Sequence, residues 1–173
     1  LEKRGCSVKV VPYNTTADEI LAIKPDGVML SNGPGDPAEN VAVIEEIRKL
    51  CEYNKLRQIE PDSATEKPVC IFGICLGHQM LALARGAKTG KLKYGHRGAN
   101  QPVKYVKTGS VYISSQNHGY AVRNETLPNG AVLSFVNTND GTCEGLTYTN
   151  VPAFSVQFRP EACSGPLDTS FLF

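Results

Sequence analysis

Short apolar runs alternate with amphipathic stretches in the first half of the chain. The runs S-V-K-V-V-P (7–12) and G-V-M-L-S (27–31) have the length and β-branched content of buried strands. Between them, T-A-D-E (16–19) predicts a capping box that opens a short helix, and Pro25 ends it. This order of strand, helix and strand is typical of a parallel α/β sheet.

A longer helical pattern follows a glycine-rich segment. Asp36 is suited to the N-cap, Pro37 to the first helical position, and Glu39 follows three residues after the cap. Apolar residues at helical spacing then predict a helix from 37 to about 53. The polar segment 52–67 predicts a surface loop, and a buried strand over 68–73 and a helix over 76–86 come next.

From about residue 88 the pattern changes to short apolar runs separated by Gly, Asn, Asp and Pro. These runs predict strands over 111–115, 131–137, 143–148 and 153–158. We therefore expect one α/β domain over 1–173, with a mixed, mostly parallel sheet flanked by helices. The chain opens on L-E-K-R-G, which is typical of the tail of a helix, so we expect a fragment whose first strand lies upstream.

Composition excludes several classes of function. The 173 residues are 41% apolar, enough for one core, and the net charge of +1 provides no field for nucleic acids or anionic membranes. No apolar run approaches the roughly 20 residues that span a bilayer, and the first residues lack the apolar region of a signal peptide, so a cytoplasmic setting is expected. The six cysteines show neither zinc-ligand spacing nor a disulfide framework.

The segment G-I-C-L-G-H-Q (73–79) joins a predicted strand to a predicted helix. Glycines on both sides of Cys75 allow a tight turn that presents the thiol, as in the nucleophile elbow of hydrolases. At a helix N-terminus, unpaired N–H groups and the helix dipole favour the thiolate. The amide of Leu76 would point to a developing oxyanion. The alternative is a buried cysteine that packs closely between two glycines.

A second glycine-rich turn, S-N-G-P-G-D-P (31–37), follows another predicted strand. In a parallel sheet both turns lie at the carboxyl edge, where ligands bind. The amides of Gly33 and Gly35 could complete an oxyanion hole and hold a carboxylate. The alternative is an ordinary loop whose glycines supply positive φ.

Five segments together resemble the class I, triad-type glutamine amidotransferase domain of carbamoyl-phosphate synthetase, either its small subunit or a fused equivalent. The resemblance covers nearly the whole chain and is carried by SNGPGDP, GICLGHQMLALA, KYGHRGANQPV (93–103), SSQNHGYAV (114–122) and SVQFRPEACSGP (155–166). It implies a flavodoxin-like fold. It also implies hydrolysis of glutamine to glutamate, with ammonia passed to a synthetase subunit or domain that makes carbamoyl phosphate.

The resemblance also implies roles for individual residues. Cys75 would be the nucleophile, with Gly33 and Leu76 as backbone donors to the oxyanion, and glutamine would be held by Gly35, Gln79, Asn117, Gly119 and Tyr120. Without the resemblance, Gln79 is equally an exposed helix residue and Asn117 a turn former. No metal or organic cofactor is implied for this domain, because ATP and magnesium belong to the synthetase partner.

One position departs from the family pattern. The family places its general-base histidine in a Q-x-H-P-E segment, with the glutamate orienting it, and here that position is Arg159, two residues before Glu161. Guanidinium stays protonated, so it cannot exchange the proton that glutamine hydrolysis requires. A cation near Cys75 would favour the thiolate, and Glu161, on the same strand face, could pair with Arg159 and weaken that effect. We expect turnover to be severely impaired.

None of the three histidines is a convincing replacement, although His118 comes closest; His78 and His96 are expected to serve elsewhere. The sequence leaves rival interpretations open. The domain is either a glutaminase, active or impaired, or a non-catalytic docking or regulatory partner of a synthetase that uses ammonia. A cysteine-dependent hydrolase of similar topology is the third, and it would act on other amides.

Overall fold

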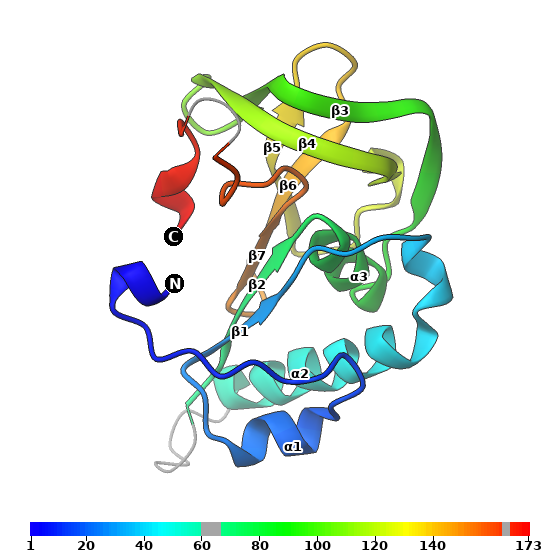
Figure 1. Ribbon diagram of the computed structural model, residues 1–173. Helices are drawn as coiled ribbons and strands as arrows, with labels where there is room; N and C mark the ends of the chain where they lie inside the picture. Colours follow the sequence, from blue (N-terminus) through cyan, green and yellow to red (C-terminus); the bar gives the residue numbers. More distant parts are fainter. Residues whose placement is uncertain (60–66, 164–166) are drawn as a thin grey trace.

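The computed structural model describes residues 1–59, 67–163 and 167–173 and shows an α/β fold (Figure 1). Within these residues seven strands form one sheet in the order β1-β2-β7-β6-β5-β3-β4. The strands are β1 (Gly27–Leu30), β2 (Cys70–Ile74), β3 (Thr89–Tyr105), β4 (Val111–Val122), β5 (Ala131–Asn137), β6 (Cys143–Tyr148) and β7 (Ala153–Val156).

The sheet is mixed, as the sequence predicts, but its parallel part is small. β1, β2 and β7 are parallel neighbours, whereas β7 to β6, β6 to β5, β5 to β3 and β3 to β4 are antiparallel. The antiparallel pairings are therefore in the majority among the described strands. They come from the second half of the chain, where consecutive strands are joined by short turns instead of helices.

Three helices cover one face of the sheet: α1 (Ala17–Ala22), α2 (Val41–Ile59) and α3 (Leu76–Ala84). The predicted capping box opens α1, because the Thr16 side chain accepts from the Glu19 amide and the Glu19 carboxylate accepts from Thr16 N–H. Asp36 caps a 3₁₀ turn, Pro37–Glu39, and α2 begins after it. The capping box is thus confirmed, whereas Asp36 caps only the 3₁₀ turn, and the long helix begins at Val41 instead of at residue 37.

Two apolar clusters lie on opposite sides of the sheet. The helices pack on the first around Ile47, Leu81 and Leu146, which are almost fully buried. The second contains Phe135 and Phe158, whose rings meet edge to face with centroids 5.2 Å apart. Burial on both sides explains why the central strands are continuous apolar runs.

Three expectations about elements are wrong in detail. Residues 7–12 form no strand, because no neighbouring strand pairs with them, and Val10 is 88% exposed. Helix α2 continues to Ile59, well into the predicted loop 52–67, whose residues 60–66 lie outside the described ones. Strand β7 ends at Val156 instead of residue 158. None of the helices in the described ranges is long and apolar enough to cross a membrane.

The parallel part of the sheet determines where the site forms. β1, β2 and β7 run in the same direction, with Leu30 opposite Gly73 and Ile74 opposite Val156. Their carboxyl ends therefore lie at one edge of the sheet. The segments that follow them, which are the glycine-rich turn, Cys75 and residues 157–161, meet at this edge.

Candidate active site

A sharp backbone bend presents Cys75 at the carboxyl end of β2. Cys75 is the N-cap of α3 and has φ 53° and ψ −104°, a conformation that residues with a side chain rarely adopt. Its amide is held by the Val156 carbonyl at 2.9 Å. A Cβ on Gly77 would overlap the Leu30 carbonyl, and one on Gly73 would lie 2.8 Å from Gly77. The two glycines are therefore required by close packing of the bend against β1 and α3.

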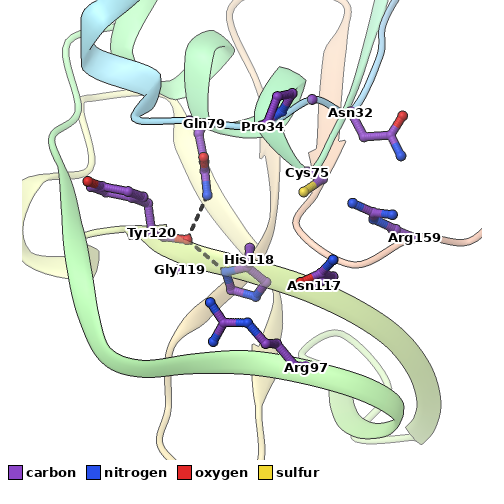
Figure 2. Close-up of a pocket in the computed structure, with 12 residues that line it drawn as sticks. Asn32, Pro34, Cys75, Gln79, Arg97, Asn117, His118, Gly119, Tyr120 and Arg159 are labelled. Carbon is purple, nitrogen blue, oxygen red and sulfur yellow. Dashed lines mark hydrogen bonds between the residues drawn. The ribbon is translucent and has the colours of Figure 1, made fainter.

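A pocket of about 460 Å³ opens beside this bend (Figure 2). Eight residues predicted for the site line it: Gly33, Gly35, Cys75, Gln79, Asn117, Gly119, Tyr120 and Arg159. The other two, Leu76 and Glu161, lie outside this lining. One wall comes from the carboxyl ends of the parallel strands, and the facing wall comes from β3 and β4.

Gln79 ties α3 to both walls of the pocket. Its side chain is only 3% exposed, so it is not a surface residue of the helix. Its amide nitrogen donates to the Tyr120 carbonyl at 2.6 Å (Figure 2) and to Gln157 Oε1 at 2.8 Å. A buried polar side chain with this many partners fixes the spacing between the elbow and β4.

Arg159 lies against the Cys75 thiol (Figure 2). Burial raises the pKa of the thiol above its ordinary value of 9.0, while the Arg159 guanidinium and the Leu76 amide act in the opposite direction. The helix N-terminus and the cation thus act in the expected direction, towards the thiolate. The loss of solvation outweighs both, so the thiol is neutral at pH 7.

Glu161 does not occupy the predicted position. Residues 157–161 follow the end of β7, so Arg159 and Glu161 do not share a strand face. The exposed Glu161 carboxylate accepts a hydrogen bond from Asn32 Nδ2 at 3.2 Å. Among the described residues it forms no ion pair with Arg159, and the expected pair is therefore wrong.

The three histidines are engaged away from the thiol. Nδ1 of His78 lies 2.8 Å from Ser155 Oγ, and burial lowers its pKa to about 3. His118 lines the pocket, but its Nδ1 donates to the Tyr120 carbonyl at 2.7 Å and burial lowers its pKa to about 4. His96 Nε2 lies 2.8 Å from Asp140 Oδ2. This arrangement supports the expectation that none of them replaces the family's base.

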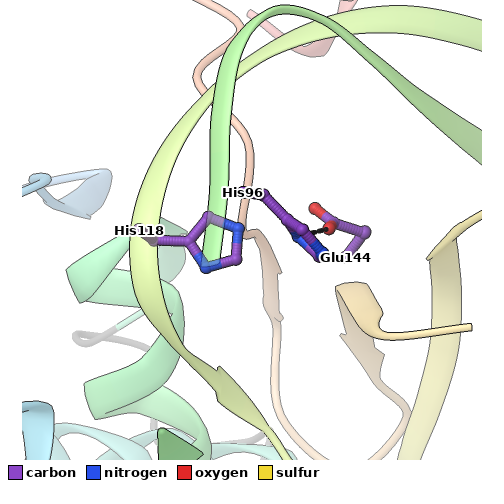
Figure 3. Close-up of side chains that lie close together, drawn as sticks. All are labelled: His96, His118 and Glu144. Atoms are coloured by element: carbon purple, nitrogen blue, oxygen red, sulfur yellow. Dashed lines mark ion pairs between the residues drawn. The ribbon is translucent and has the colours of Figure 1, made fainter. Parts of the chain in front are cut away.

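His96 on β3, His118 on β4 and Glu144 on β6 form a largely buried cluster (Figure 3). Their ligand-type atoms lie within 4.8 Å of one another, a set that is chemically able to hold a metal ion. Both ring nitrogens of His118 already face partners, and the rings of His96 and His118 meet edge to face at 4.9 Å. The cluster is therefore explained as a polar network that supports the β4 wall.

This network predicts a pH-dependent stability. Glu144 Oε1 lies 3.2 Å from His96 Nδ1, close enough for the carboxylate to stabilise the protonated imidazole. Together with Asp140 it raises the pKa of His96 from 6.5 to about 9, and burial raises the pKa of Glu144. The folded state therefore binds protons more tightly than the unfolded chain, and stability falls as pH rises from 6.5 through about 9.

Urea unfolding across this pH range tests the effect. We expect the free energy of unfolding to decline with pH in the protein, and His96→Asn to flatten that decline. An equal decline in His96→Asn would place the titrating group elsewhere.

Sequence reasoning did not assign Arg97, Asn32 or Pro34 to the pocket. Arg97 stands opposite Asn117 in the pairing of β3 with β4, and this places its guanidinium near Gly119. The register contains irregularities between Lys91 and His96 and again after Gly98. Such bulges change which side chains share a face, so alternation along the strand could not place Arg97 in the pocket. The only signal for Arg97 in the sequence was the motif KYGHRGANQPV itself.

The chain matches known proteins over its whole length. The family model for glutamine amidotransferase class-I matches residues 1–173. The chain is 54% identical over 173 residues to a carbamoyl phosphate synthase small chain of Methanocaldococcus jannaschii, and 53% identical over 174 residues to that of Fusobacterium nucleatum. The two alignments include 100% of this chain but only 45% and 44% of those proteins, so this chain spans less than half of their length.

Solved structures share the fold. A candidate GMP synthase protein from Thermoplasma acidophilum has a TM-score of 0.71 at 23% identity, covering 95% of this chain and 76% of that one. A glutamine amidotransferase from Thermotoga maritima has a TM-score of 0.58 at 23% identity, covering 79% and 56% respectively. Because the family model matches all 173 residues, the chain belongs to the class I glutamine amidotransferase family.

Proposed function

We propose that this domain is the glutaminase module of a carbamoyl-phosphate synthetase and that Arg159 leaves it with severely reduced turnover. The observation that carries the proposal is the strained Cys75, presented into a pocket whose lining includes Gln79, Asn117 and Tyr120. The relatives named carbamoyl phosphate synthase small chain support the assignment to this branch.

The geometry suits attack by sulfur on an amide carbonyl. Cys75 Sγ would add to the ω-carbonyl carbon of glutamine, and its electron pair would move to the carbonyl oxygen. The Leu76 amide lies beside Sγ and Gly33 lines the same pocket, which supports the proposal that both donate to the oxyanion. Collapse of this intermediate gives a thioester and ammonia, and water then releases glutamate.

The step that lacks support is proton transfer. The thiol must lose a proton and the leaving ammonia must gain one, and a single group near pH 7 normally does both. Arg159 cannot do so, and His78 and His118 are neutral and hydrogen-bonded elsewhere. Any ammonia released would pass to a synthetase partner, which would hold the ATP and magnesium.

A second function is favoured by the same arginine. The domain would keep its fold and pocket and act as a docking or regulatory partner of a synthetase supplied with free ammonia. Under this proposal, glutamine does not support carbamoyl phosphate formation in the presence of the synthetase, whereas ammonium does.

Covalent labelling tests whether the pocket recognises a glutamine-like ligand independently of turnover. A glutamine analogue with a chloroketone in place of the ω-amide is expected to alkylate Cys75 at alkaline pH, where the thiolate is populated. Peptide mass spectrometry would locate the adduct.

Cys163 provides the matched control because its thiol is exposed and outside the pocket lining. Cys163→Ala should retain the pocket adduct, and Cys75→Ala should lose it. If a simple chloroketone without the amino acid part labels Cys75 at the same rate, the pocket does not recognise the amino acid and the proposed function fails.

A further inference from the structure

The pocket contains two guanidinium groups and no carboxylate. Arg97 enters it from β3, and Arg159 enters from the segment after β7 (Figure 2). Its lining includes neither Asp nor Glu. Within the described part of the chain, neither arginine forms an ion pair with an acidic side chain. The residues that line the pocket therefore carry two positive charges and no negative one.

Arg159 stands where the ω-group of a bound amino acid would lie. This placement rests on the proposed function, in which Cys75 Sγ faces the ω-carbon, and Arg159 lies against that sulfur. From this arrangement we infer that the pocket selects an amino acid with an ω-carboxylate of glutamate length in preference to glutamine. The same substitution that removes the imidazole thus changes the ligand that the pocket prefers.

Hydrogen-bond chemistry favours the carboxylate. A guanidinium offers only donors, and a carboxylate accepts two of them in parallel. An amide presents one acceptor and an NH₂ group, whose donors would face the donors of Arg159. The buried Nε of Arg159 has no hydrogen-bond partner among the described residues, so no protein acceptor takes that donor.

Two acidic groups lie near this arrangement. The Cys75 thiol is neutral and does not compete as an anion. The Glu161 carboxylate, held by Asn32 at 3.2 Å, opposes the effect of Arg159 on the thiol, but its contribution is the smaller of the two. Glutamine and glutamate share the α-carboxylate, so Arg97 attracts that group in both. Only glutamate adds a second negative charge next to Arg159, so the preference depends on Arg159.

Calorimetric titration of the purified protein with glutamate, glutamine and aspartate tests this selectivity. We expect glutamate to bind at least roughly tenfold more tightly than glutamine, since one charge-assisted pair is worth that much. Aspartate, one methylene shorter, should bind more weakly than glutamate. Arg159→Gln should abolish the preference for glutamate, and Arg159→His should bind glutamine.

Arg123→Gln is the matched control, because Arg123 is an exposed arginine outside the pocket lining, 3.9 Å from Glu125. It should leave the glutamate preference intact. If the unmodified protein binds glutamine more strongly than glutamate, the inference is wrong and the proposed function is retained. The same conclusion follows if Arg159→Gln keeps the preference for glutamate. If neither the unmodified protein nor Arg159→His binds glutamate or glutamine, the proposed function is wrong as well.

Discussion

Replacing Arg159 with histidine is expected to raise the rate of glutamine hydrolysis by roughly 10²–10⁴-fold, the usual contribution of a positioned acid–base group. The position is already next to the Cys75 thiol, since Arg159 is the group whose charge acts most strongly on it. An imidazole there can accept the thiol proton and return it to ammonia. Glutamate release, measured with the synthetase partner present, gives the rate.

Two controls give this experiment its meaning. Arg159→Gln also removes the charge but supplies no titratable group, so it should not recover the rate. Arg159→His combined with Cys75→Ala should be inactive, because the nucleophile is absent. If the unmodified protein hydrolyses glutamine as fast as Arg159→His, the base is not at this position and the proposed impairment is wrong.

Gly77→Ala is expected to destabilise the fold by about 3 kcal/mol or more, at the upper end of the cost of overpacking. The new Cβ would overlap the Leu30 carbonyl and lie 2.7 Å from Leu30 Cβ. The Leu30 backbone belongs to β1, which pairs with β2, so it cannot move aside as a flexible side chain can. Helix α3 would have to lift away from β1, which displaces Cys75 as well.

Urea denaturation measures this loss, and Gly119→Ala is the comparison. A Cβ at Gly119 would meet Arg97 at 3.7 Å, an ordinary contact, and its φ is not in the left-handed region. We expect Gly119→Ala to change stability by less than about 1 kcal/mol. Similar stability of Gly77→Ala and Gly119→Ala would contradict the close packing of the elbow.

Local signals in the sequence predicted the elements that position the nucleophile. The capping box at Thr16, the N-cap at Asp36 and the glycines around Cys75 each have a local physical cause, and each is found in the structure. Residues 7–12 show the limit of this approach. Their composition suits a strand, but a strand also needs a neighbour, and the pattern of one segment does not contain that information.

The pocket was predictable on one side only. Parallel strands bring their carboxyl ends to one edge, so Cys75 and Gly33 could be placed together from the order of elements. Arg97 depends on the bulged register between β3 and β4, and the orientation of Glu161 depends on where β7 ends. The pKa of Cys75 is raised because the thiol is buried, and no local motif in the sequence predicts that burial.

The backbone of Cys75 carries a wider implication. At φ 53° glycine would be the easier residue, so the thiol is retained at a cost to folding. Stability and reactivity therefore select for different residues at this one position. In a lineage that no longer uses the sulfur, substitution of Cys75 by glycine would increase the stability of the fold. Position 75 is therefore expected to be among the first to change in such a lineage.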